Sequence, residues 1–369
     1  MNRNEGREQP RRISTLDGFR ALAIMMVVAF HYNVRWSAPA DVPPHLPVAS
    51  PFARFIPFEY GWMGVQLFFS ISGFVILMTL TRSRGLRDFA VRRFARLWPA
   101  LIVASALTTL IVNAIGPHEW RVGIGDYATS LTLIEPQLWN LAGLHVEWVD
   151  SVYWTLWVEL CFYFVAAILF FAARRDFLKV WLAFQLLVVV AALLLPAAAV
   201  EMIAFPHQLP YFTIGICTFE LWSGTKARKL AIGGAVFAAA LILADATVTH
   251  GAIQPQLPVI IGDLSIFALF ALFLLDHPIL KPFAWKPVVL LGQASYSLYL
   301  IHQEIGVSLL RQLSGIPFVA ALALVVAVCV GTSLALFRWI EVPAKKWLVQ
   351  RLSTRRPAAG HPAYGTMEV

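Results

Sequence analysis

Charged residues are scarce in this chain. Only 14% of its 369 residues are Asp, Glu, Lys or Arg, whereas 59% are hydrophobic and the mean hydropathy is +0.70. Soluble domains carry charge on about a quarter of their residues, so this composition argues against a string of soluble domains. It is typical of a polytopic membrane protein.

Cysteine is also rare, with three residues (Cys161, Cys217 and Cys329), each inside an apolar run. No C-x-x-C spacing occurs, so the sequence favours neither a disulfide framework nor a zinc site, and we expect no metal. The basic N-terminal segment is followed by an apolar run that lacks a small-residue cleavage site. This run therefore predicts a retained first helix rather than a secretory signal peptide.

Long hydrophobic runs, by contrast, are abundant, and ten approach the ~20 residues that a helix needs to cross a bilayer. They cover residues 16–35, 61–80, 97–115, 152–173, 177–198, 207–223, 230–247, 257–276, 288–309 and 317–338. The short gaps and the lack of a fixed repeat predict an all-α polytopic membrane bundle of about ten transmembrane helices. We expect one integral-membrane domain over residues 1–350 and a disordered tail over 351–369, which mixes Pro, Gly and basic residues.

The net charge of +8 would suit a nucleic-acid partner, but the placement of the basic residues argues against one. With the N-terminus inside, all but four of the 29 Lys and Arg residues fall in cytoplasmic segments. The four outside are Arg35, Arg54, Arg121 and Arg311. This bias predicts that both termini are cytoplasmic. It also predicts that the moderately apolar segment Tyr127–Leu144 is an interfacial or re-entrant piece on the outer side, because a full span there would reverse every later loop.

The run Leu16–Tyr32 combines an apolar helix with Arg20 near its start and His31 eleven positions later. At 100° per residue, His31 lies within about 20° of the face of Arg20 and about 16 Å further along the axis. The predicted topology puts Arg20 at the cytoplasmic surface and His31 near the middle of the bilayer. Ionisable groups at that depth are costly and by default mark functional sites.

Polar residues of other spans are expected at a similar depth. Counting along the helix axes places Glu159, His302, Ser70 and Ser72 near the layer of His31. Equal depth does not show contact, and each residue has a structural alternative. A histidine or a protonated acid can bond a neighbouring helix, and small residues allow close helix packing. The layer makes His31 and Glu159 candidates for catalysis, and Ser70 and His302 candidates for substrate binding.

A second candidate cluster is the basic segment Arg92-Arg93-Phe94-Ala95-Arg96. Arg93 and Arg96 are three residues apart, which puts them on one helical face. Paired guanidinium groups suit a phosphate-bearing donor, and Arg20 is expected at the same membrane surface. The alternative is that these arginines only satisfy the positive-inside bias.

These motifs, taken in order, resemble the integral-membrane acyltransferase-3 family. DGFR followed by His31 is similar to the family's D-G-[LF]-R-x10-H opening, and LFFSISGFVI, RRFARLWPA, YWTLWVELCFY and GQASYSLYLIHQ follow in family order. The last match is RWIEVPAKKW at 338–347, which is similar to the family's final E-x-P-[AG]-[RK]-[RK] stretch. The ordered set covers nearly all of the predicted helices, which makes the resemblance specific.

The resemblance implies transfer of an acyl group, typically acetyl, from cytoplasmic acyl-CoA to a hydroxyl of a carbohydrate or related acceptor. It also implies that His31 is the catalytic histidine with Arg20 beside it, and that Arg93 and Arg96 face the CoA phosphates. Acyl-CoA, most simply acetyl-CoA, would be a co-substrate, and no tightly bound cofactor is expected.

Glu159 matches the acid of the family's W-[ST]-L-x-x-E segment. Many members have a second acid and a Gln directly after it, but Leu160 and Cys161 stand here. This difference argues against a role that needs paired carboxylates and leaves a role for Glu159 itself open.

The chemistry of the candidate residues, considered apart from the resemblance, is also compatible with acyl transfer. A thioester is already activated, so the enzyme must deprotonate the hydroxyl and stabilise an oxyanion. A neutral His31 suits the general base, and Glu159 could hold its tautomer or relay the proton. Tyr296, Tyr299 or Ser295 could donate to the carbonyl oxygen. An acyl-histidine relay across the membrane is an open alternative.

We therefore expect a multi-pass membrane O-acyltransferase of the bacterial inner membrane. Its expected partners are acyl-CoA, the lipid bilayer and a glycan or other hydroxyl-bearing acceptor, with polysaccharide-assembly proteins as a further option. A small secreted metabolite such as a macrolide is an alternative acceptor. A proton-coupled transporter using His31, Glu159 and His302 is a rival, although no repeated halves are found. A third alternative is a scaffold in which the polar layer only packs helices.

Overall fold

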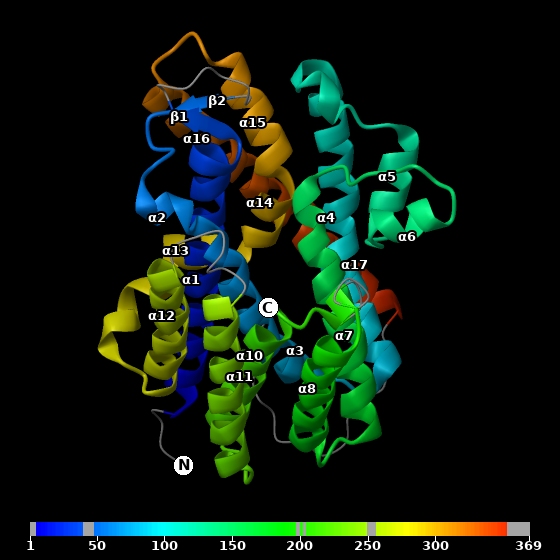
Figure 1. The fold of residues 1–369 in the computed structure, drawn as a ribbon, viewed down its shortest axis with the longest axis vertical. Coiled ribbons are helices and arrows are strands. Elements are labelled where there is room, and N and C mark those ends of the chain that lie inside the picture. Colours follow the sequence, from blue (N-terminus) through cyan, green and yellow to red (C-terminus); the bar gives the residue numbers. More distant parts are fainter. Residues whose placement is uncertain (1–4, 40–47, 197–199, 202–203, 249–255, 353–369) are drawn as a thin grey trace.

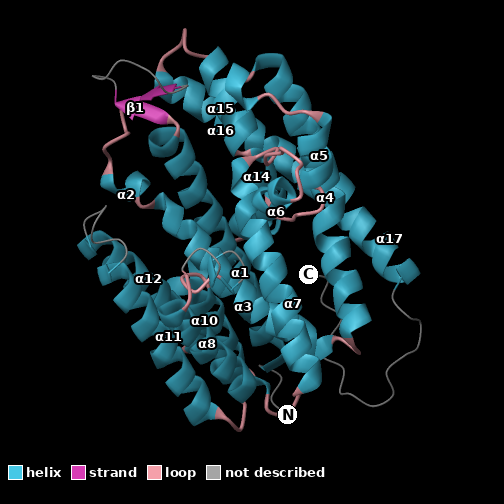
Figure 2. Ribbon diagram, turned by 45° about the vertical axis from the view of Figure 1, so that its right-hand side comes forward, coloured by secondary structure: helices cyan, strands magenta, loops and turns pink. Residues whose placement is uncertain are grey.

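A computed structural model describes residues 5–39, 48–196, 200–201, 204–248 and 256–352. Almost all of this part of the chain is helical. Figure 2 shows its one strand pair at one end of the bundle, where β1 (Ser37–Pro39) pairs in parallel with β2 (Val48–Ser50). The predicted all-α membrane bundle is therefore confirmed.

The main helices follow in chain order (Figure 1). They are α1 (Glu5–Phe30), α3 (Gly64–Arg82), α4 (Leu86–Ile115), α7 (Trp154–Ala172), α8 (Phe177–Leu194), α10 (Leu209–Trp222), α11 (Arg228–Val248), α12 (Gln256–Leu274), α13 (Lys286–Gln293), α14 (Ser295–Ile301), α15 (Gln303–Gln312), α16 (Phe318–Leu336) and α17 (Val342–Leu352). Short helices are α2 (Ile56–Glu59), α5 (Ile124–Ser130) and α6 (Pro136–Leu141). π-Helical turns extend α1 over His31–Arg35 and α16 over Phe337–Glu341.

Eight helices of the described chain are long and apolar enough to cross a membrane. Two of the ten predicted spans take another form. The run at 207–223 is α10, which has only 14 residues and is buried along most of its length, so neighbouring helices rather than lipid surround it. The run at 288–309 is assigned to α13, α14 and α15, with Ala294 and His302 between them; His302 keeps helical backbone angles, and backbone hydrogen bonds continue from α14 into α15 through it.

The segment Tyr127–Leu144 holds the end of α5 and all of α6, which have 7 and 6 residues and are too short to span a bilayer. The indole of Trp98 donates to the Leu131 carbonyl at 3.0 Å and so fixes the segment against α4. Its placement on the outer side stays a prediction. The predicted disordered tail starts at Arg351, but Arg351 and Leu352 end α17, and residues 353–369 lie outside the described residues.

The buried apolar side chains form two large clusters. One gathers where α3, α7, α8, α10 and α12 meet, and the other joins the far end of α1 to α4 and α14–α16. Val65, Phe68 and Tyr296 pack against both clusters. The seam between the clusters is where the polar residues of interest collect.

Helices α3 and α10 approach each other closely through small residues. A Cβ atom on Gly215 would overlap the Ser70 carbonyl, and one on Gly73 would overlap backbone atoms of Phe212. Ser70 is fully buried in this contact, and its hydroxyl donates to the Gln66 carbonyl of its own helix at 3.0 Å. Here Ser70 has a packing role.

Candidate functional site

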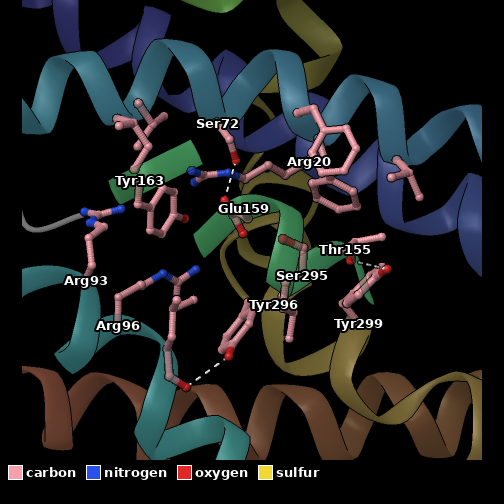
Figure 3. A pocket seen from close by; sticks show the side chains of 17 residues that line it. Arg20, Ser72, Arg93, Arg96, Thr155, Glu159, Tyr163, Ser295, Tyr296 and Tyr299 are labelled. Atoms are coloured by element: carbon pink, nitrogen blue, oxygen red, sulfur yellow. Dashed lines mark hydrogen bonds between the residues drawn. The ribbon is translucent and has the colours of Figure 1, made fainter. Parts of the chain in front are cut away.

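A cavity of about 100 Å³ lies at the seam, between α1, α3, α4, α7 and α14. Its polar lining consists of Arg20, Ser72, Arg93, Arg96, Thr155, Glu159, Tyr163, Ser295, Tyr296 and Tyr299. In Figure 3 the three guanidinium groups come together around Tyr163 and Glu159, and Thr155 and Tyr299 lie at the other end. The structure thus brings together most of the residues that the sequence singled out.

Arg20 and Arg96 are each held by a carboxylate. Arg20 Nη1 lies 2.9 Å from Asp17 Oδ1, one helical turn earlier. Arg96 pairs with Glu341, a residue only 1% exposed that also accepts a hydrogen bond from Ser297 Oγ at 3.1 Å. These ion pairs fix the direction in which the two guanidinium groups enter the cavity.

Arg93 is positioned mainly by packing. Its guanidinium carbon lies 5.8 Å from the ring centre of Tyr163 and 5.9 Å from that of Phe89, and one nitrogen donates to Thr79 Oγ1 at 3.2 Å. Its Nε is buried and finds no acceptor within the described part of the chain. Glu159 in the lining and Asp17 and Glu341 beside it offset the three guanidinium charges. The case for an anionic ligand therefore rests on Arg93, which is held mainly by packing, and on the nearby Lys345.

Glu159 accepts a hydrogen bond of 2.6 Å from Ser72 Oγ, which comes from the facing helix α3 (Figure 3). The hypothesis that Glu159 holds the tautomer of His31 finds no support in this geometry, because the hydrogen bonds of His31 go elsewhere. Ser72, rather than its near neighbour Ser70, is the serine of α3 that lines the cavity.

The tyrosines of α14 line the cavity with their rings while their hydroxyls bind neighbouring segments. Tyr299 Oη lies 2.7 Å from Thr155 Oγ1 and donates to the Val152 carbonyl at 3.1 Å. Tyr296 Oη donates to the Leu97 carbonyl at 3.0 Å. Both hydroxyls thus join α14 to other elements.

His31 and His302 do not line this cavity, but they contact each other. His31 Nδ1 lies 3.3 Å from His302 Nε2, and the two ring centres are 4.9 Å apart at 77°. Tyr299 connects the pair to the cavity, because its side chain lines the cavity while its carbonyl lies 2.8 Å from His302 Nδ1. The single polar layer expected from the sequence is therefore two neighbouring groups, an arginine–glutamate cavity and a histidine pair.

Behind the histidine pair, the side chain of Asp150 is fully buried. It accepts hydrogen bonds from the Gln303 amide at 3.1 Å and from the backbone amides of Val152 and Glu304 at 3.1 and 3.2 Å. Burial raises the pKa of the Asp150 carboxyl. These bonds fix the start of α15, and with it the position of His302 just before that helix.

Two further residues near the arginines had no assigned role in the sequence. Glu341 pairs with Arg96, and Lys345 of α17 interacts electrostatically with Arg20, Arg93 and Arg96. Both lie in the RWIEVPAKKW segment, so the signal was visible as part of the resemblance, but only the fold brings that segment to the arginines. Among the described residues, no cluster of three or more His, Cys, Asp or Glu side chains could hold a metal ion.

Comparison with known families decides the classification of this chain. A family model described as an acyltransferase domain matches residues 13–338. The chain belongs to the acyltransferase-3 family. The match includes every cavity residue and both histidines, and it ends shortly before Glu341 and Lys345.

Several curated relatives are similar over most of this chain. The peptidoglycan O-acetyltransferase OatA of Listeria monocytogenes is 27% identical, and the alignment covers 90% of this chain and 56% of the relative. The exopolysaccharide production protein ExoZ of Rhizobium meliloti is 28% identical over 82% of this chain and 94% of its own length. The O-acetyltransferase OatA of Staphylococcus aureus is 23% identical over 83% of this chain.

The chain thus spans about half the length of the OatA relatives that it matches. No solved structure matches it.

Proposed function

We propose that this protein is a membrane O-acyltransferase that moves an acyl group, most simply acetyl, from acyl-CoA to a hydroxyl of a carbohydrate. The observation that supports this most directly is the cavity in which Arg20, Arg93 and Arg96 face Glu159 at the seam of the bundle. Guanidinium groups bind phosphates with two parallel hydrogen bonds, and the donor carries several phosphates. A space of about 100 Å³ is small and suits the thioester end of the donor, and in this proposal the phosphates lie at the arginine end of the cavity.

In the reaction that we propose, His31 is the general base. It accepts the proton of the acceptor hydroxyl while the hydroxyl oxygen attacks the thioester carbonyl carbon. The new C–O bond forms, the C–S bond breaks, and the proton passes to the departing thiolate. Tyr299 is the residue shared by the cavity and the histidine pair, so the thioester would meet the hydroxyl beside it.

For the acceptor we propose a sugar hydroxyl of a cell-surface polysaccharide. Support comes from the relatives, because one is named a peptidoglycan O-acetyltransferase and another an exopolysaccharide production protein. The distribution of Lys and Arg supports cytoplasmic termini, and we assign the protein to a bacterial inner membrane because the matched relatives are bacterial. In this arrangement the arginine end of the cavity opens toward cytoplasmic acyl-CoA, within one membrane domain over residues 1–350.

The test uses the purified full-length protein in lipid vesicles, supplied with labelled acetyl-CoA and a pool of polysaccharide acceptors. We expect label on an acceptor, release of free CoA, and loss of both in His31→Ala. If the wild-type protein transfers no label to any acceptor and releases no CoA, the proposed function is wrong.

A second pair of variants tests the donor site. Arg93→Gln should raise the KM for acetyl-CoA about tenfold or more, because it removes a charged donor group from the cavity. Arg92→Gln is the matched control, since Arg92 does not line the cavity and its side chain pairs with Asp88. Equal KM values for the two variants would contradict the assignment of the cavity to the donor.

A further inference from the structure

The protons of the histidine pair can be assigned from the acceptors around it. His302 Nδ1 lies 2.8 Å from the Tyr299 carbonyl, and His31 Nδ1 lies 2.8 Å from the Val27 carbonyl. A carbonyl oxygen only accepts, so each ring must carry its proton on Nδ1 to make these bonds. In a neutral imidazole the other nitrogen, Nε2, is then bare.

The contact between the rings agrees with this assignment. His302 Nε2 lies 3.3 Å from His31 Nδ1, so the bare nitrogen of His302 faces the N–H of His31 and accepts from it. The His31 proton is thus shared between the Val27 carbonyl and His302. The opposite arrangement, with His302 donating from Nε2, would remove its proton from Nδ1 and leave two acceptors facing each other at the Tyr299 carbonyl.

We infer that His302 is a positioning residue that holds His31 in the tautomer whose Nε2 is free to act as the base. This inference rests on the proposed function and adds the atom that takes the proton. When Nε2 of His31 gains the hydroxyl proton, the imidazolium keeps its Nδ1–H directed at Val27 and His302, and both stabilise the positive charge. His302 itself touches neither donor nor acceptor in this account.

The surroundings of His302 are built to keep it in place. The side chain is fully buried, and its own carbonyl accepts a hydrogen bond of 2.6 Å from Tyr32 Oη. That hydroxyl reaches the carbonyl by passing Gly306, where a Cβ atom would lie 2.7 Å from Tyr32 Cε1 and overlap the hydroxyl itself. On the other helix, the π-helical turn begins at His31, a feature frequent at functional sites.

The first experiment compares side chains at position 302 that can and cannot accept a hydrogen bond where His302 Nε2 lies. His302→Gln keeps an amide oxygen near that position and should retain kcat within about threefold. His302→Leu has a similar size but no hydrogen-bond acceptor. It should lower kcat about 10- to 100-fold, because this corresponds to the loss of one hydrogen bond to a charged group. The KM for acetyl-CoA should stay within about threefold in both.

His207→Gln is the matched control, because this histidine pairs with Asp245 at 2.8 Å and is in neither the cavity nor the histidine pair. It should transfer like the wild type. If His302→Leu keeps full kcat, or if the Gln and Leu variants lose activity equally together with a lowered Tm, the positioning role is wrong.

The second experiment reads the tautomer without using activity. Solid-state NMR of ¹⁵N-histidine-labelled protein in bilayers distinguishes protonated from bare ring nitrogens, and His31→Gln identifies the signals of that residue by subtraction. We expect His31 to be protonated on Nδ1 and bare on Nε2. A His31 that is protonated on Nε2 would overturn the inference whatever the activity. Absence of transfer by a protein with the expected spectrum would instead count against the proposed function.

Discussion

Replacing Gly306 by alanine should disturb the histidine pair without changing any polar group. Gly306 lies in α15, and a Cβ atom there would overlap the hydroxyl of Tyr32, which donates to the His302 carbonyl at 2.6 Å. Because the space is filled on the Tyr32 side, the ring must move and the hydrogen bond must break.

The size of the effect follows from three contributions. Overpacking a filled interior costs about 1–3 kcal/mol. Loss of the tyrosine hydrogen bond costs about 1 kcal/mol more. Alanine is favoured over glycine within a helix by about 1 kcal/mol, which offsets part of the cost. The net destabilisation should be about 1–3 kcal/mol, and transfer activity should fall because the segment that carries His302 shifts.

Gly331→Ala is the matched control for this change. Gly331 lies inside α16, and an added Cβ atom would meet nothing within 4 Å. Thermal unfolding of both variants in the same detergent, together with transfer rates in vesicles, gives the comparison. We expect a lower Tm and slower transfer for Gly306→Ala only. If the two variants unfold at the same temperature and transfer at the same rate, the argument from Tyr32 packing fails.

Three further variants test the polar contacts. Glu341→Gln should lower the free energy of unfolding by about 3 kcal/mol, because it leaves the Arg96 charge without its buried partner. In a denaturation experiment, the double variant Glu341→Gln/Arg96→Gln should recover part of this lost free energy. Ser72→Ala removes the 2.6 Å hydrogen bond to Glu159 and should slow transfer about tenfold or more. Ser70→Ala is its control and should transfer like the wild type; equal transfer rates for the Ser72 and Ser70 variants would show that the contact between Ser72 and Glu159 does not matter. Thr155→Val removes one hydrogen-bond partner of the Tyr299 hydroxyl and should lower kcat. The Tm should change little, because the Val152 carbonyl still accepts from Tyr299. A kcat equal to that of the wild type would contradict a role for Thr155 in holding Tyr299.

The arginine cluster could be predicted from the sequence because its geometry is largely local. Residues three apart share a face of any α-helix, so Arg93 and Arg96 had to point the same way once α4 was recognised. Most of the membrane-spanning helices could also be predicted from the sequence, because length and apolar content define a membrane span. These criteria could not anticipate that α10 would be shorter and enclosed by protein, or that the backbone of the run at 288–309 would depart from helical angles at Ala294.

The partners of each polar residue could not be predicted, because they depend on how helices distant in sequence pack. Ser70 and Ser72 lie at nearly the same depth but about 160° apart around α3, on almost opposite faces. This helix is apolar on all sides, so no stripe indicates which serine faces the cavity. His31 and His302 are 271 positions apart, and only the assembled bundle shows that they meet each other rather than Glu159.

The two polar groups are mechanically connected through Tyr299. Its hydroxyl bonds to Thr155 and to the Val152 carbonyl, so the position of α14 relative to the start of α7 sets one wall of the cavity. Its own carbonyl binds Nδ1 of His302, three residues further along the chain. A donor that pushed α14 away from α7 would therefore also move the carbonyl that holds His302. The backbone amides of His302 and Gly306 donate to the carbonyls of Leu298 and His302 at 3.0 and 3.1 Å, so the helix continues through His302 and α14 would move together with α15. If His31 is the base that we propose, Tyr299 and His302 therefore form the path by which a ligand in the cavity would affect its orientation.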